Sequence, residues 1–225
     1  MTREMSNRPY RMKLRAELQE RTRRRITVSA LELHGTLGPS RTTISAVATH
    51  AGVRRSTLYR HFPDEAALFA ACTAHWMEGN PQPDLTSWAT IADPDARLRE
   101  GLGELYAYYR RTEALLANVL RDEATMPIVK RMLGGYRDYL TAARDTLMSG
   151  RRGNGRARQR VLAAIGHALT FGTWRSLAGE QELTDSQAAD LMCRLVAVAA
   201  GRSDRRRATP ARAVKMAGRH PYAIY

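Results

Sequence analysis

The side chains best suited to bind another molecule are concentrated at positions 54–61, which read RRSTLYRH. This stretch combines guanidinium, hydroxyl, phenol and imidazole groups, and its one aliphatic member is Leu58. The first carboxylate after it is Asp64, whereas an ordinary solvated helix usually mixes both signs of charge. Guanidinium groups and hydroxyls are the donors that proteins direct at DNA phosphates and base edges. We therefore expect a DNA-contacting helix with the candidate residues Arg54, Arg55, Ser56, Thr57, Tyr59, Arg60 and His61.

A short amphipathic helix is predicted immediately before this stretch. Apolar residues recur with the spacing of one helical face from Ile44 to Ala51. Thr42 or Thr43 stands where a hydroxyl can accept a backbone N–H as the N-cap. Gly52 then suits a tight turn. Two helices joined by a glycine-containing turn form a helix-turn-helix unit, whose second helix enters the major groove.

At these residues the sequence resembles the tetracycline-repressor (TetR) family of transcription regulators. The matching segments are ALELHGTLGPSRTT, AVATHAGV across the turn, STLYRHF in the second helix and PDEAALF after it. A later segment, FGTWRSL, resembles a C-terminal pattern of one branch of the family. The resemblance implies an all-α homodimer with an N-terminal helix-turn-helix domain that binds double-stranded operator DNA. It also implies a C-terminal domain that binds a small-molecule effector and dimerises, most often in a repressor.

The resemblance extends to individual DNA contacts, with two departures. Arg54 stands where the family often has a serine-like cap, so the second helix gains one cation. Glu65 stands where the family commonly has a lysine aimed at a phosphate, so one anchor is missing and the basic N-terminus is expected to compensate. The family's phosphate positions are matched by Thr42, Thr43, Tyr59 and His61, and the expected base contacts are Arg55, Ser56 and Thr57, with Ser45 as a further candidate.

The positive charge of the chain is concentrated at its two ends. Residues 1–25 and 201–225 together supply +12 of the net charge of +14, and residues 65–200 carry equal numbers of acidic and basic groups. A merely solubilising composition would spread the excess evenly. This pattern indicates a polyanionic partner. We expect residues 1–12 to be a disordered basic arm, which either reaches DNA or is a solvated tail, and residues 201–225 to be a flexible basic tail.

The rest of the chain is predicted to be all-α, because apolar residues follow helical spacing and no strand-like alternation occurs. Residues 13–64 form the expected DNA-binding domain, and residues 65–200 form the expected ligand-binding and dimerisation domain. Asp64 and Asp93 are expected N-caps, the latter followed by a proline at the first helical position. The expected helices are 13–37, 44–51, 53–61, 65–77, 94–109, 112–120, 127–148 with a glycine-weakened middle, 161–177 and 184–200.

The two last helices are apolar on more than one side and therefore need cover beyond their own domain. The family uses such a pair to form a four-helix bundle with the second subunit; an ordinary pair within one chain is the alternative. The expected dimer interface is Ile165, Leu169, Gly172, Ser176, Leu191, Leu195 and Val198.

Aromatic residues and methionines gather in the C-terminal helices, as they do in pockets between bundle helices. Core packing is the alternative for any single one of them. Because this domain carries balanced charge, an apolar or aromatic effector is expected. The candidate pocket residues are Trp76, Tyr106, Tyr109, Met132, Tyr136, Tyr139, His167, Phe171 and Trp174.

Sequence motifs of catalysis are missing: GxxxxGK[ST], HExxH and GxSxG do not occur. Cys72 and His75 could share a metal, but no second pair lies near them in the sequence. We therefore expect no enzyme activity, cofactor or metal. No secretory signal or membrane-spanning run occurs, so a cytoplasmic protein is expected. The rival function is a ligand-independent DNA-binding protein with little sequence preference, acting through its basic ends.

Overall fold

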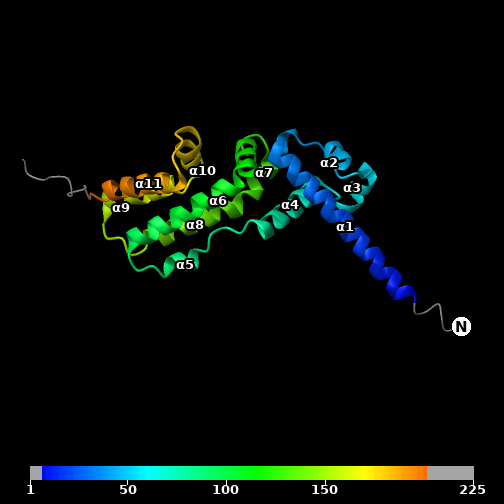
Figure 1. Cartoon of the computed structure of the whole chain (residues 1–225), viewed down its shortest axis with the longest axis horizontal. Helices are drawn as coiled ribbons and strands as arrows, with labels where there is room; N and C mark the ends of the chain where they lie inside the picture. The colour runs from blue at the N-terminus through cyan, green and yellow to red at the C-terminus, as the bar shows by residue number, and fades with distance from the viewer. Residues whose placement is uncertain (1–6, 202–225) are drawn as a thin grey trace, which may run out of the picture.

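A computed structural model describes residues 7–201, with side chains from Tyr10 onward. Within this range the chain is helical and contains no strand, which confirms the all-α prediction. A small head and a longer helical body lie end to end (Figure 1). No helix of the described part is long and apolar enough to cross a bilayer. The head contains α1 (Asn7–Thr36), a 3₁₀ turn (Pro39–Arg41), α2 (Ile44–His50) and α3 (Arg55–His61), with α4 (Glu65–Gly79) leading into the body.

The head folds around a compact apolar core to which α1, α2, α3 and α4 all contribute. Ile26 and Leu58 are fully buried there, and Leu68 and Cys72 of α4 join them. Local signals set the ends of the short helices: the Thr43 hydroxyl accepts the Ala46 N–H at 3.1 Å as the predicted N-cap. Because α4 shares this core, the head is fixed to the first long helix of the body.

The first helix begins earlier than the sequence pattern predicted. α1 starts at Asn7 rather than near Lys13, so residues 7–12 are helical and not a disordered arm. Residues 11–20, which continue this helix, are rich in arginine, leucine, glutamate and glutamine, which are good helix formers, and Pro9 falls in the first turn, where it is tolerated. The remaining expectations for the ends of the chain, residues 1–6 and 202–225, lie outside the described residues.

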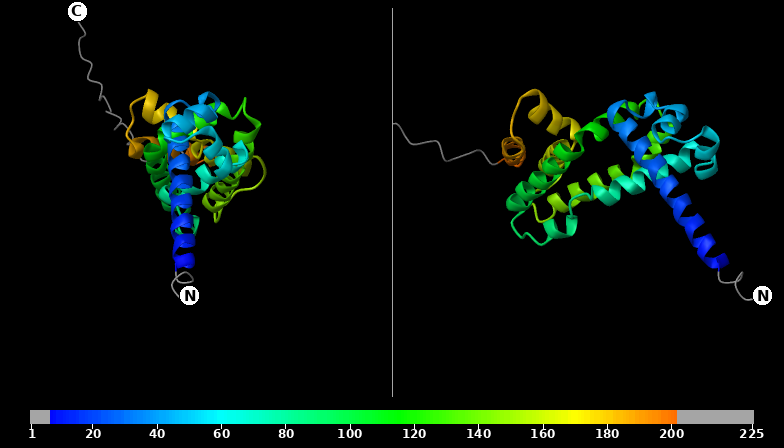
Figure 2. Two further views of the ribbon diagram at one scale, coloured as in Figure 1. Left: turned by 90° about the vertical axis from the view of Figure 1, so that its right-hand side faces the viewer. Right: turned by 45° about the vertical axis from the view of Figure 1, so that its right-hand side comes forward.

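The body is a bundle in which α6 is the central rod (Figures 1 and 2). The predicted Asp93 cap and Pro94 start are confirmed, but the expected break near residue 110 is absent and one helix continues. Thr112 does not end it, since its hydroxyl bonds the Tyr108 carbonyl at 2.7 Å within the same helix. The body contains α5 (Leu85–Ala89), α6 (Pro94–Asp122), α7 (Pro127–Met132), α8 (Gly134–Met148), α9 (Gly155–Ala168), α10 (Phe171–Trp174), a π turn (Arg175–Glu180) and α11 (Asp185–Ala199).

Two predicted long helices are each divided. The helix expected over 127–148 breaks at Leu133, next to the glycine pair that was expected to weaken it. The helix expected over 161–177 ends at Ala168, and Thr170 caps a new one by accepting the Thr173 N–H at 3.2 Å. This second break alters which side chains share a face.

Candidate functional site

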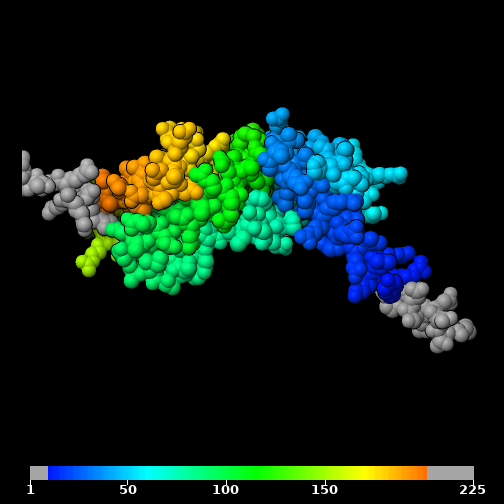
Figure 3. All heavy atoms as spheres, in the orientation of Figure 1, coloured from blue at the N-terminus to red at the C-terminus, as the bar shows by residue number. Residues whose placement is uncertain are grey.

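Helix α3 exposes a cationic and hydroxyl-bearing surface at one end of the molecule (Figures 1 and 3). Leu58 is fully buried and fixes the helix to the head core. Tyr59 is 44 % exposed, Thr57 and His61 are half-buried, and no carboxylate lies within the helix. The exposed members of the predicted DNA-contacting set are Arg54, Arg55, Ser56, Tyr59 and Arg60 on α3, together with Thr43 and Ser45 at the start of α2.

The turn between α2 and α3 sets the angle of this surface. Gly52 has a φ of +62°, a left-handed conformation that glycine adopts without a steric penalty. The Val53 N–H donates to the Ala48 carbonyl at 2.9 Å across the turn. Thr42 is half-buried and its hydroxyl donates to the Gly38 carbonyl at 2.8 Å, so this hydroxyl is held by the turn before α2.

The far end of α3 is tied to α1 by Arg23. Its guanidinium donates to the His61 carbonyl at 2.6 Å and lies 4.2 Å from the centre of the Phe62 ring. Arg23 is turned toward the end of α3, because the C-terminal carbonyls of a helix need donors. Partial burial, then Arg60 and Arg23, lower the pKa of His61, so its imidazole is neutral at pH 7.

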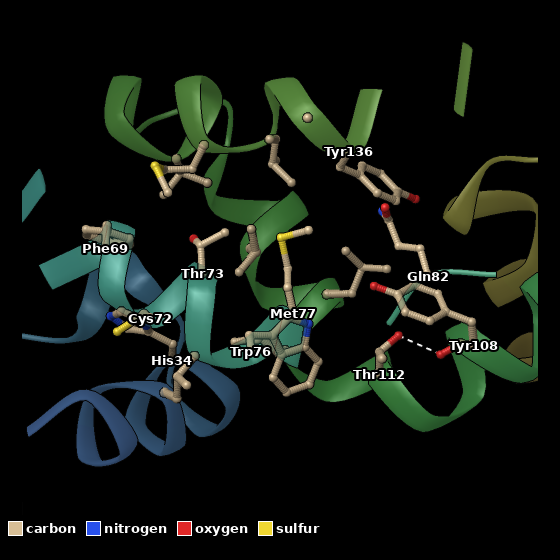
Figure 4. Close-up of a pocket in the computed structure, with 18 residues that line it drawn as sticks. His34, Phe69, Cys72, Thr73, Trp76, Met77, Gln82, Tyr108, Thr112 and Tyr136 are labelled. Carbon is tan, nitrogen blue, oxygen red and sulfur yellow. Dashed lines mark hydrogen bonds between the residues drawn. The ribbon is translucent and has the colours of Figure 1, made fainter. Parts of the chain in front are cut away.

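An apolar cavity of about 290 Å³ lies where the head meets the body (Figure 4). Three predicted pocket residues line it: Trp76, Met132 and Tyr136. The head also contributes to the cavity through His34, which was not among the predicted pocket residues although it follows Ile26, Ala30 and Leu33 on the inner face of α1. The other residues that line the cavity include Leu31, His34, Phe69, Cys72, Thr73, Met77, Gln82, Tyr108, Thr112, Leu116 and Val119.

The cavity offers no charged partner to a ligand. No aspartate, glutamate, lysine or arginine of the described chain lines it. The one titratable base is His34, which stacks on Phe69 with ring centres 5.0 Å apart. Burial lowers the pKa of His34 to about 4, with a weak opposing effect of Asp122, so the ring is neutral at pH 7. The polar groups available are those of Thr73, Gln82, Tyr108 and Tyr136 (Figure 4).

The other six predicted pocket residues lie outside this cavity. Tyr106 and Tyr109 are fully buried and donate to the Ala168 and Leu169 carbonyls at 2.9 and 2.6 Å. These bonds satisfy the end of α9, where the chain breaks before α10. Phe171 and Trp174 pack on Tyr109 in a closed cluster, and Tyr139 donates to the Pro83 carbonyl at 3.1 Å. His167 is exposed, and α9 ends at the next residue. His167, Phe171 and Trp174 therefore do not share a helical face, as the spacing i, i+4, i+7 would require in an unbroken helix over 161–177.

The predicted dimer residues also divide into two groups. Ile165 and Leu169 are buried inside the body, at 0 % and 1 % exposure, so they cannot face a second subunit. They belong to the same apolar core as Leu102 and Leu105 of α6. The exposed or half-buried members of the set are Gly172, Ser176, Leu191, Leu195 and Val198.

The C-terminal end of α6 fastens the body to the head. The Asn118 amide donates to the Gly35 carbonyl at 2.7 Å and to the His34 carbonyl at 3.2 Å, and Arg121 donates to the Leu37 carbonyl at 3.1 Å. Asp122 accepts the Ser40 N–H at 2.9 Å. These side chains therefore satisfy the orphan carbonyls at the end of α1. We call Asn118, Arg121 and Asp122 the junction.

Cys72 and His75 do not form a metal site in the structure. The Cys72 thiol is buried and donates to the Thr27 carbonyl at 3.7 Å, and burial raises its pKa to about 12. His75 lies instead 3.6 Å from Glu78. No group of three or more histidine, cysteine, aspartate or glutamate side chains that could hold a metal occurs among the described residues.

Comparison with known proteins supports a regulator. The sequence profile of the bacterial regulatory proteins of the tetR family matches residues 26–72, which span the end of α1 to the middle of α4. A search of curated protein sequences returned no match.

Solved structures share the fold over most of the chain. A proposed TetR-family regulator from Mesorhizobium loti is 16 % identical, with a TM-score of 0.58 over 81 % of this chain and 96 % of that one. A TetR-like regulator from Rhodococcus sp. RHA1 is 19 % identical, with a TM-score of 0.57 over 78 % and 93 %. A proposed fatty acid metabolism regulator from Clostridium perfringens is 17 % identical, with a TM-score of 0.56 over 76 % and 96 %. Residues 26–72 are therefore a tetR-family DNA-binding domain, carried by a chain with the fold of a TetR-type transcription regulator.

Proposed function

We propose that the protein is a homodimeric transcriptional repressor that is released from a pseudo-palindromic operator by a small, uncharged and mainly apolar molecule. The observation that carries the proposal is the surface of α3, which presents guanidinium and hydroxyl groups while Leu58 holds the helix in the head. In this reading Arg55, Ser56 and Thr57 read base edges, with Ser45 of α2 as a further reader. Thr43, Tyr59 and the neutral His61 bind phosphates.

The decisive experiment selects DNA fragments from the protein's own genome and then competes the best fragment with bulk DNA. A specific regulator prefers its site by roughly 10³-fold or more. The rival function, a ligand-independent protein that binds through its basic ends, predicts similar affinity for both DNAs. Equal affinity would therefore refute the repressor and leave the rival.

Dimerisation is proposed through α11. One face of this helix packs into the body through Met192 and Val196. The other exposes an apolar row, with Leu191, Leu195 and Val198 at 38 %, 47 % and 65 % exposure. A two-fold pairing of this row, flanked by Gly172 and Ser176, would hold two α3 helices for half-sites about 34 Å apart.

A matched pair of variants tests this interface. Leu191→Glu should convert the dimer to a monomer in sedimentation, because a buried unpaired carboxylate is costly. Leu37→Glu in the head is the control, since Leu37 has the same exposure of 38 %. If Leu191→Glu and a second variant, Leu195→Glu, both remain dimeric, the interface lies elsewhere.

The effector is proposed to bind in the cavity between head and body. A volume of about 290 Å³ is at the lower end of small-molecule sites, so a compact ligand is expected. Neutral His34 and the uncharged lining favour an uncharged molecule with an aromatic or aliphatic body, because an unpaired ion would be costly to bury. Trp76 and Tyr108 provide aromatic walls, while Thr73 and Gln82 can orient one polar group.

Filling the cavity tests this site. Thr73→Phe places a ring in the space, so the variant should bind DNA but fail to release it with compounds that release the parent protein. Ala74→Phe is the control, because Ala74 lies on the exposed side of the same helix. Normal release by Thr73→Phe would move the effector site away from this cavity.

The junction is the proposed route from effector to DNA. Leu116 and Val119 of α6 line the cavity, and Asn118 in the same turn holds the end of α1. A ligand that displaces these walls would shift the population toward head positions that no longer match the operator. Asn118→Ala should therefore retain DNA binding and effector binding but lose part of the coupling between them, measured as the shift in DNA affinity at saturating effector.

A further inference from the structure

The N-terminal half of α1 extends beyond the head as an isolated helix (Figures 1 and 3). Every side chain from Tyr10 to Arg21 is exposed, whereas burial begins at Ile26. The span from Tyr10 to Arg25 is about 23 Å long at 1.5 Å per residue. We call residues 10–25 the arm.

The charges of the arm are sorted by face. At about 100° per residue, its two carboxylates, Glu17 and Glu20, fall on one side with Lys13 and Arg24. A neighbouring arc of about 140° contains no acid and holds four arginines between apolar and hydroxyl side chains. This basic face consists of Tyr10, Arg11, Leu14, Arg15, Leu18, Arg21, Thr22 and Arg25.

The basic face is turned away from the body. Glu20 and Arg24, on the opposite side of the arm, line a surface hollow together with Ala71 and His75 of α4. On the side of the basic face, Glu32 lies 3.7 Å from His50 of α2. Leu14 of the basic face has the same angular position on α1 as Glu32, because 18 residues make five whole turns of an α-helix. The basic face therefore points to the side of α1 on which His50 of α2 lies.

The arm has a fixed position relative to α3. Arg23 at its base donates to the His61 carbonyl at 2.6 Å and lies over the Phe62 ring, so the end of α3 is fastened to the start of the arm. Glu17 and Glu20 stand four residues before Arg21 and Arg24, a spacing that supports the helix. The arm is therefore a stiff continuation of the head that begins beside the DNA-contacting helix.

We propose that the arm is a second DNA-binding element, a basic helix that binds backbone phosphates outside the groove occupied by α3, through Arg11, Arg15, Arg21 and Arg25. The arm is about 23 Å long, which exceeds the width of about 12 Å of the major groove. Because it starts beside α3 and projects beyond the head, it can reach phosphates outside the groove that α3 occupies. Guanidinium groups suit phosphate oxygens and carry no sequence information there. This inference rests on the proposed DNA-binding function and adds to it a contact that is independent of base sequence.

The test compares two variants that remove equal charge from opposite faces of the arm. Arg11→Gln with Arg15→Gln should lower affinity for the selected operator and for random DNA by the same factor. Because each protomer of the proposed dimer loses two contacts, the slope of log K against log salt should become shallower by about 3.6, at about 0.9 for each phosphate contact. Lys13→Gln with Arg24→Gln is the control and should change the slope by less than half as much. Equal changes in both would overturn the specific role of the basic face.

A helix-breaking variant tests the stiffness of the arm. Ala16→Pro keeps every charge but interrupts the helix, so it should flatten the salt slope as the double arginine variant does. An unchanged slope in Ala16→Pro would overturn a rigid arm.

Two outcomes separate the arm from the proposed function. If the parent protein binds DNA and neither double variant of the arm alters the salt slope, only the proposal for the arm fails. If the parent protein binds no DNA, the proposal for the arm and the proposed function both fail. If Leu14→Ala with Leu18→Ala changes the oligomeric state in sedimentation while the slope stays constant, the arm binds a second copy instead of DNA.

Discussion

The polar and aromatic side chains that point to a function face outward in the head of this protein and inward in its body. In the head, a compact core that includes Ile26 and Leu58 lies beneath an outer surface of arginines and hydroxyls. In the body, the corresponding polar and aromatic groups point inward. Tyr109 bonds the end of α9 in a closed cluster, while Tyr108 and Tyr136 face an open cavity.

This difference explains why one region can be interpreted from the sequence and the other cannot. Outward-facing residues of a short helix lie close together in the chain, so their composition is visible directly. The cavity is assembled from α1, α4, α6, α7 and α8, and its members alternate with residues that only pack. In the body, the sequence position of an aromatic residue is therefore as consistent with core packing as with ligand binding.

The largest expected effect distinguishes the closed cluster from the cavity. Phe171→Ala should lower the free energy of unfolding by about 3–5 kcal/mol, because Phe171 is buried against Tyr109 and Trp174. Phe69→Ala should cost less, because Phe69 already borders empty space. Denaturant unfolding of both variants measures the contrast, and equal losses would contradict the distinction between a packed and a hollow region.

The next effect concerns the pH dependence of the cavity wall. The pKa of His34 is about 4 in the folded protein and 6.5 in an unperturbed histidine, so the unfolded chain binds a proton first as the pH falls. The free energy of unfolding should therefore decrease by about 2 kcal/mol between pH 7 and pH 5.

His34→Phe removes this titration while retaining a ring to stack on Phe69. It should lose correspondingly less stability between pH 7 and pH 5 in urea unfolding. A His34→Phe protein with the parent's pH dependence would show that His34 is not protected from protonation.

The smallest effect on stability, and the clearest on binding, is expected in the head. Thr57→Ala and Tyr59→Phe should each weaken operator binding by about 1 kcal/mol, roughly five-fold, because each removes one hydroxyl contact. Thermal melting should stay within about 0.5 kcal/mol of the parent, since Tyr59 is exposed and Leu58 holds the helix. Unchanged operator affinity in both variants would refute the docking of α3.

The sequence by itself determined the fold class, the helix-turn-helix and most helix starts. Thr43, Asp64 and Asp93 act as caps where they were predicted, because a cap depends on residues within one turn of each other. The tetR-type domain was identified for the same reason, since its defining residues are contiguous.

Only the tertiary structure decided which apolar side chains are covered and where a cavity remains. An unbroken helix over 161–177 would place His167, Phe171 and Trp174 on one face. The chain instead breaks between His167 and Phe171, where the Tyr106 and Tyr109 hydroxyls, some 60 residues away, satisfy the end of α9. The sequence pattern also predicted Ile165 and Leu169 as interface residues, whereas both lie in the core of the body, where α8 and α11 pack on α9. Such contacts depend on side chains brought together from distant segments, and no local spacing encodes them.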